Sequence, residues 1–174
     1  MLKFEKIQKN KHQIVDKKGD IVESGSQYLK TLNFTKLSEG AIIPKRATNG
    51  SAGLDLCACT DECIVLNPGE RKLIHTGLAI ELPSSGFAAF IFGRSGLGIK
   101  HGITLSNSVG VIDSDYRGEI CVGLCNLGNE PYEINHGDRI AQLVIMRVEN
   151  PEPVLVEALS ETDRGTGGFG STGK

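Results

Sequence analysis

Short apolar runs separated by glycine- or proline-containing turns dominate the middle of the chain. Between Gly118 and Leu127, apolar side chains alternate at Ile120, Val122 and Leu124, and between Arg139 and Val148 they alternate at Ala141, Leu143 and Ile145. Such a period of two is typical of β-strands. Further strands are predicted from Cys63 to Leu66, from Arg71 to Leu82 and from Phe87 to Phe92. Because no long segment has a helical period, we predict an all-β sandwich or barrel.

Two flanking segments lack this pattern. Residues 1–28 are polar and rich in lysine, and Ile14–Val15 and Ile21–Val22 are spaced to close a small hairpin. The last eleven residues, 164–174, include five glycines. We expect them to bury little apolar area and to be mobile when nothing is bound. The predicted organisation is an N-terminal extension (1–28), a β domain (29–163) and a mobile C-terminal lid (164–174).

Composition narrows the class of protein. The chain has 174 residues, of which 39% are hydrophobic and 23% charged, which fits one soluble globular domain. A formal net charge of -2 argues against a broad nucleic-acid surface, so a polyanionic ligand requires a local basic site. We find neither an apolar run long enough to span a membrane nor an apolar signal core, and we expect a cytoplasmic protein with no membrane partner.

The cysteines and histidines do not have metal-ligand spacing. An odd cysteine count without a signal peptide argues against a disulfide framework. The five cysteines are Cys57, Cys59, Cys63, Cys121 and Cys125. No Cys-x-x-Cys pair and no zinc-spaced histidine pair is present, so we expect reduced thiols in or near the core. We also expect His75, inside a strand-like run, to be a satisfied and partly buried side chain.

The glycine-rich C-terminal segment carries groups that suit a phosphate. Its amides, together with Ser171 and Thr172, can donate hydrogen bonds to phosphate oxygens, and Arg164 adds a bidentate charged contact. Phe169 can stack on a base. The alternative is a disordered tail, but a lone aromatic residue within a glycine run favours a lid over a substrate.

Five stretches, taken in order, resemble the motifs of the trimeric dUTPase family. They are Ala52–Leu56, Gly93–Leu97, Asn107–Glu119, Gly137–Leu143 and Arg164–Gly173. The resemblance covers the chain from about residue 35 to its end. It implies a jelly-roll-like β fold, a homotrimer with three sites, dependence on Mg²⁺, and hydrolysis of dUTP to dUMP and pyrophosphate. Two positions depart from the family pattern: Gly93 replaces the usual proline, and Leu54 stands where tyrosine is frequent.

The third stretch, Asn107–Glu119, contains the residue that the resemblance implies is catalytic. The resemblance makes Asp113 the base that activates the attacking water, whereas its local sequence alone also fits a turn-capping aspartate. The same resemblance assigns uracil and deoxyribose binding to Asn107, Gly110, Val111, Ile112, Tyr116 and Phe169. A backbone that pairs with the base edge discriminates against cytosine. Gly110 allows an approach that excludes the methyl group of thymine, and the ring of Tyr116 leaves no room for a 2′-hydroxyl.

Phosphate binding is implied at residues from the second, fourth and fifth stretches. They are Arg94, Ser95, Gly96, Gln142, Arg164, Gly170, Ser171 and Thr172. The local alternatives are a polar turn at Arg94–Gly96 and an outward strand position at Gln142. Asp55, flanked by leucines, is implied to hold Mg²⁺ through water, and its alternative is a structural role.

Two other functions remain open from sequence. A dCTP deaminase, alone or bifunctional, shares the fold, but its pattern around the aspartate typically carries a tryptophan, and this chain has none. A non-catalytic nucleotide-sensing or protein-interaction module could use the N-terminal extension. The intact Asp113, Arg94 and C-terminal motif favour the hydrolase.

Overall fold

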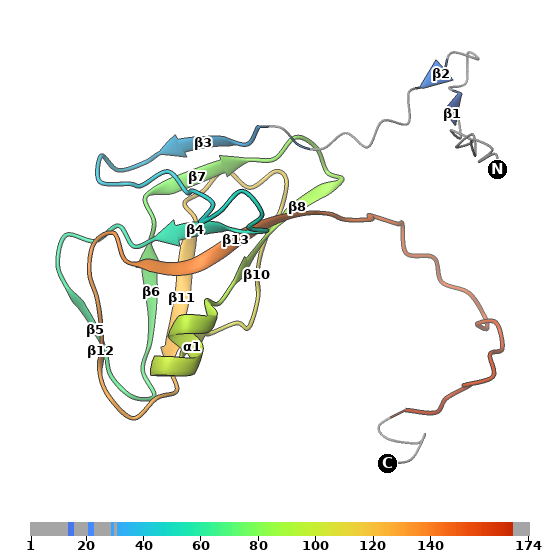
Figure 1. Cartoon of the computed structure of the whole chain (residues 1–174). Helices are drawn as coiled ribbons and strands as arrows, with labels where there is room; N and C mark the ends of the chain where they lie inside the picture. The colour runs from blue at the N-terminus through green and yellow to red at the C-terminus, as the bar shows by residue number, and fades with distance from the viewer. Residues whose placement is uncertain (1–13, 16–20, 23–28, 30, 169–174) are drawn as a thin grey trace, which may run out of the picture.

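Strands make up nearly all of the regular secondary structure in the described residues (Figure 1). The computed structural model describes residues 14–15, 21–22, 29 and 31–168. In this part the order is β1 (Ile14–Val15), β2 (Ile21–Val22), β3 (Asn33–Lys36), β4 (Leu54–Cys57), β5 (Ile64–Leu66), β6 (Arg71–His75), β7 (Leu78–Glu81), β8 (Phe87–Phe92), α1 (Ser95–His101), β9 (Ile103–Leu105), β10 (Gly110–Ile112), β11 (Cys121–Asn126), β12 (Tyr132–Ile134) and β13 (Arg139–Arg147). None of the described helical residues forms a segment long and apolar enough to cross a membrane.

Two antiparallel sheets contribute most of the core. One has the strand order β10-β8-β13-β4 and the other the order β6-β11-β9. Side chains from both sheets, including Leu143 of β13 and Leu124 of β11, belong to one buried apolar cluster. Two-stranded pairs β12-β5 and β3-β7 flank these sheets, and β1 pairs with β2. The arrangement confirms the predicted all-β sandwich.

The alternating pattern places the core residues as predicted, with one local exception. In β11, Val122 and Leu124 are each 1% exposed. In β13, Ala141 and Leu143 are buried, but so is Ile140, which strict alternation would place on the opposite face. The register of β13 against β4 shifts between Arg139 and Ala141. A β-bulge re-aims side chains locally, which explains why Ile140 joins the core.

The predicted strand from Arg71 to Leu82 is two strands. β6 ends at His75 and pairs with β11, whereas β7 begins at Leu78 and pairs with β3. Gly77 between them has a φ of 66°. A positive φ interrupts a β-strand, and glycine adopts it without a steric penalty. The apolar run therefore crosses from one sheet to another, which its hydrophobic pattern alone does not reveal.

Helix α1 begins at Ser95, within the Arg94–Gly96 stretch that the local sequence could also explain as a polar turn. It has seven residues, and Leu97 is its one buried side chain. Arg94 is the N-cap residue, and the C-cap Gly102 has a φ of 71° with its N–H directed to the carbonyls of Gly98 and Leu97. A helix of two turns contains too few apolar positions to show a helical period in the sequence, so this helix was not predicted.

We expect the fold to be sensitive to substitution of Gly102. A Cβ added there would clash with the Gly128 nitrogen and would lie 2.7 Å from the Gly128 Cα. We expect Gly102→Ala to reduce the free energy of unfolding by about 2–3 kcal/mol, because backbone strain and overpacking add. Gly69→Ala is the matched control: its φ is 78° but nothing lies within 4 Å, so only strain of about 1 kcal/mol applies. Urea unfolding at one protein concentration measures both, and equal losses would contradict the clash.

Candidate active site

A cavity of about 250 Å³ lies at the outer edge of the four-stranded sheet, beside β10. It brings together all but one of the residues predicted to bind the nucleoside. Its lining includes Asn107, Gly110, Val111, Ile112, Asp113 and Tyr116. The structure therefore gathers the third sequence motif around one hollow.

Backbone geometry shapes this cavity. Gly110 pairs with Ile91 of β8, and a Cβ at Gly110 would lie 3.1 Å from the Cβ of Ile91. Glycine thus lets the two strands pack closely at the edge of the cavity. The turn before β10 is tight: Ser108 has a φ of 65°, and the Val109 N–H donates to the Asn107 carbonyl over 2.7 Å. The Tyr116 hydroxyl donates to the carbonyl of Glu119 over 2.9 Å, which orients its ring.

Asp113 follows the end of β10 and is exposed. Its carbonyl accepts a hydrogen bond from the Tyr116 N–H over 3.2 Å, which closes a turn. Within the described part of the chain, its carboxylate has no hydrogen-bond or ion-pair partner. The backbone, not the side chain, closes this turn, so the carboxylate remains available to a water molecule.

A second cavity, of about 180 Å³, collects the residues predicted to contact phosphates. Its lining includes Asp55, Arg94, Ser95, Gly96, Arg139 and Gln142. Register explains the convergence, because Gln142 of β13 pairs with Asp55 of β4 on one side and with Phe92 of β8 on the other. The chain then turns after Phe92 into Arg94 and the first residues of α1.

Charges in this second cavity are organised around one carboxylate. Asp55 Oδ1 lies 3.4 Å from Arg94 Nε, and Asp55 Oδ2 lies 3.1 Å from Arg139 Nη1. Arg94 Nη1 also donates to the carbonyl of Arg139 over 2.7 Å. Two guanidinium groups against one carboxylate leave the cluster with a net positive charge, which suits an anion. Arg139 was not predicted as a site residue, although its place in the fourth motif, three residues before Gln142, was an available signal.

The two cavities are well separated within one chain. Ile112 pairs with Ala89, so Asp113 stands one residue further along, whereas Gln142 pairs with Phe92 near the other end of β8. Two strand spacings, about 10 Å, and four residues, about 13 Å, put the Cα atoms of Asp113 and Gln142 about 16 Å apart. No described residue lines both cavities.

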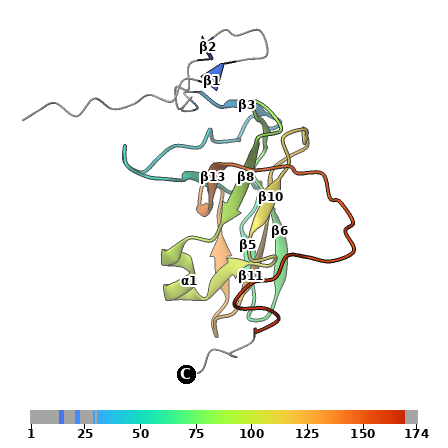
Figure 2. The same cartoon turned by 90° about the vertical axis from the view of Figure 1, so that its right-hand side faces the viewer.

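The described part of the C-terminal segment, residues 164–168, lines neither cavity. After β13 the chain leaves the sheets, as Figures 1 and 2 show from two directions. Arg164 is exposed, and its Nε donates to the carbonyl of Gly167 over 2.8 Å. It lines neither cavity. Phe169, Gly170, Ser171 and Thr172 lie outside the described residues.

Comparison with known proteins agrees with these motifs. The dUTPase family model matches residues 39–173. The deoxyuridine 5'-triphosphate nucleotidohydrolase of Treponema denticola is 54% identical over 140 residues, covering 80% of this chain and 96% of the relative. The protein of the same name from Coxiella burnetii is 56% identical over 132 residues, covering 76% of this chain and 87% of the relative.

Solved structures support the same relationship. The dUTPase of Staphylococcus bacteriophage 80alpha, in complex with dUPNHPP, is 30% identical and has a TM-score of 0.76, covering 83% of this chain and 99% of that one. A mutant dUTPase from phage phi11 of S. aureus, reported with the coordination of a structural Mg(II) ion, is 29% identical, with a TM-score of 0.67 and coverages of 74% and 97%. The likeness confirms the jelly-roll-like fold type. Sequence, fold and motif placement agree, and the chain belongs to the dUTPase family.

Proposed function

We propose that this protein hydrolyses dUTP to dUMP and pyrophosphate, which limits uracil incorporation into DNA and supplies dUMP. The observation that carries the proposal is the carboxylate of Asp113, held in one cavity with Gly110 and Tyr116 and without a partner among the described residues. Family membership and the phage structure with a dUTP analogue support the same substrate.

Asp113 acts as the general base in this proposal. Its carboxylate holds a water and accepts a proton as the oxygen attacks the α-phosphorus, and pyrophosphate leaves. Arg94 and Gln142 hold the phosphates, while Ser95 and Gly96 at the start of α1 add a hydroxyl and an amide. These groups position the triphosphate and stabilise the charge that develops on its oxygens.

The nucleoside cavity selects the base and the sugar. Its edge backbone, Gly110 to Ile112, pairs with uracil, and cytosine would leave buried polar groups without partners. The close approach at Gly110 excludes the methyl group of thymine. Tyr116, anchored through its hydroxyl to the Glu119 carbonyl, packs on the deoxyribose and excludes a 2′-hydroxyl. Asn107 completes the turn that presents this backbone.

A hydrated Mg²⁺ would reach Asp55 only together with the triphosphate, because two arginines make this cavity positive without it. Both oxygens of this carboxylate already face arginines, so the described residues of this cavity offer too few free oxygens for a dedicated inner-shell cage. Mg²⁺ commonly keeps several waters and binds through one or two carboxylates and substrate phosphates. When bound, the ion neutralises part of the phosphate charge, and Asp55 contacts it through water.

A homotrimer is the assembly that we propose. The distance between Asp113 and Gln142 within one chain supports a site that takes these residues from different copies. An apolar groove of about 690 Å³ is lined by Phe34, Ile43, Leu54, Phe87 and Ile145 among others. The segment after β13 has exposed apolar side chains, namely Val154, Leu155, Val156 and Leu159. We infer that this segment crosses to a neighbouring copy, docks in such a groove and brings residues 164–174 to the neighbour's site as a lid.

Substrate specificity tests the proposed reaction. We expect pyrophosphate release from dUTP in the presence of Mg²⁺ to exceed release from dTTP, dCTP and UTP by at least about 10³-fold in kcat/KM, because each competitor loses a specific fit in the cavity. The assay compares the four triphosphates at equal concentration and follows pyrophosphate. Ammonia release from dCTP would instead identify a deaminase, and tight nucleotide binding without turnover would identify a sensor.

A further inference from the structure

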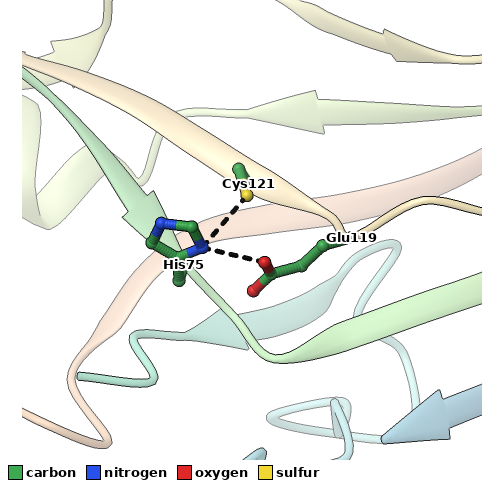
Figure 3. Close-up of side chains that lie close together, drawn as sticks. All are labelled: His75, Glu119 and Cys121. Atoms are coloured by element: carbon green, nitrogen blue, oxygen red, sulfur yellow. Dashed lines mark hydrogen bonds and ion pairs between the residues drawn. The ribbon is translucent and has the colours of Figure 1, made fainter. Parts of the chain in front are cut away.

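Three side chains without a part in the proposed reaction converge beside the nucleoside cavity (Figure 3). His75 of β6 pairs directly with Cys121 of β11, so their side chains share one face of the sheet. Glu119 precedes Cys121 by two residues and points to the same place. His75 Nδ1 lies 2.8 Å from Glu119 Oε2 and 3.5 Å from Cys121 Sγ.

These distances are close to those around a tetrahedral zinc ion. Bond lengths of about 2.3 Å to sulfur and about 2.0–2.1 Å to nitrogen place the two ligand atoms about 3.6 Å apart. The observed Sγ to Nδ1 distance is 3.5 Å, and all three ligand atoms lie within 4.8 Å of one another. Around zinc, a carboxylate oxygen and an imidazole nitrogen lie about 3.4 Å apart. The observed distance from Glu119 Oε2 to His75 Nδ1 is 2.8 Å, so Glu119 has to move away from His75 by only about 0.6 Å.

A neighbouring amide holds Glu119 in the orientation that a ligand needs. The Gly77 N–H donates to Glu119 Oε1 over 2.8 Å, which leaves Oε2 directed at His75. Metal-binding carboxylates are commonly oriented in this way by a second hydrogen bond. Burial raises the pKa of Glu119, but the hydrogen bonds from His75 and Gly77 outweigh burial, and the net pKa is lowered. The carboxylate is therefore ionised at neutral pH.

The thiol does not fit a nucleophilic or redox role. Burial and the negative charge of Glu119 raise the pKa of Cys121 to about 11. A protonated thiol is a poor nucleophile and is slow to oxidise. A metal ion would take the Cys121 sulfur as a thiolate ligand.

We propose that His75, Glu119 and Cys121 form a binding site for one Zn²⁺ per chain. Nitrogen, oxygen and sulfur ligands together select zinc-like ions over Mg²⁺, which prefers oxygen alone. Three protein ligands leave a fourth position for water. Because Glu119 and Cys121 also line the nucleoside cavity, the ion lies in the wall of that cavity and not at Asp55.

Cobalt titration of the metal-free, reduced, full-length protein tests the site. We expect one Co²⁺ to bind per chain and to produce a thiolate-to-cobalt charge-transfer band in the near ultraviolet. Stoichiometric Zn²⁺ should abolish the band, and a large excess of Mg²⁺ should leave it unchanged. Absence of a thiolate band from the wild-type protein would overturn the proposal, and the result does not depend on dUTP hydrolysis.

Three variants assign the ligands. Cys121→Ser should eliminate the band, and His75→Ala should weaken Co²⁺ binding at least tenfold. Cys63→Ser is the matched control, because this exposed thiol lies outside the cluster, and it should retain the wild-type band and affinity. Circular dichroism and thermal melts establish that each variant is folded. A band of wild-type intensity in Cys121→Ser, or unchanged affinity in His75→Ala, would exclude the assigned ligands.

Discussion

Asp113→Asn is expected to lower kcat for dUTP by about 10²- to 10⁴-fold, the range that a positioned general base contributes. The amide is nearly the same size, so the cavity should keep its shape and its affinity for nucleotide. It cannot accept the proton of the attacking water. Initial rates of pyrophosphate release and binding of a non-hydrolysable dUTP analogue separate the two effects.

Asp115→Asn is the matched control for this substitution. Asp115 is a carboxylate two residues further along the same exposed turn and does not line the nucleoside cavity. Its replacement removes the same charge from almost the same place and should change kcat less than about twofold, because a screened surface charge contributes little. Wild-type turnover in Asp113→Asn, or an equal loss in both variants, would refute the role of Asp113 as the base.

Truncation after Asp163 is expected to lower kcat/KM for dUTP by at least about 100-fold. It removes Arg164, whose proposed charged hydrogen bonds to phosphate would contribute about 1.5–3 kcal/mol, or about 10- to 100-fold on their own. It also removes Phe169 and the remaining phosphate donors. Arg164→Ala in the full chain should show a smaller loss than the truncation. Light scattering should show the same oligomer, because the apolar segment that ends before Arg164 is retained.

Assemblies that mix two variant subunits show whether residues 164–174 act on the site of their own subunit or on that of a neighbour. Truncated subunits mixed with full-length Asp113→Asn subunits should recover part of the wild-type activity if residues 164–174 act on a neighbour. Activity that stays at the level of the separate variants would limit the segment to its own chain. Undiminished turnover of the truncated protein by itself would refute the lid.

The sequence predicted those parts of the molecule that depend on short-range pattern. Alternation in β11 and β13 identified the buried faces, and the order of five motifs identified the family. Alternation failed at Ile140, where the bulge adds a residue to one strand, and at Gly77, where a run of apolar residues passes between sheets. Both failures have a backbone cause that the hydrophobic pattern does not record.

Contacts between distant segments were not predictable from spacing. His75 and Cys121 are 46 residues apart, and they meet because β6 pairs with β11 in one register. Histidine at this position was expected to be partly buried, which is wrong: its side chain is 59% exposed. The Asp55 to Arg139 pair likewise joins two strands that are distant in sequence. The separation of Asp113 from Gln142 also follows from sheet order and not from any motif.

The two arginines that face Asp55 have an entropic consequence for substrate binding. A long flexible side chain that becomes fixed only when its ligand arrives costs about 0.5–1.5 kcal/mol of binding free energy. Asp55 and the Arg139 carbonyl already hold Arg94, and Asp55 holds Arg139, before any phosphate is present. Most of that conformational loss occurs during folding, when core burial offsets it. Asp55 lowers the positive charge of this cavity. By holding Arg94 and Arg139 in place, it would also reduce the entropic cost of binding a triphosphate there.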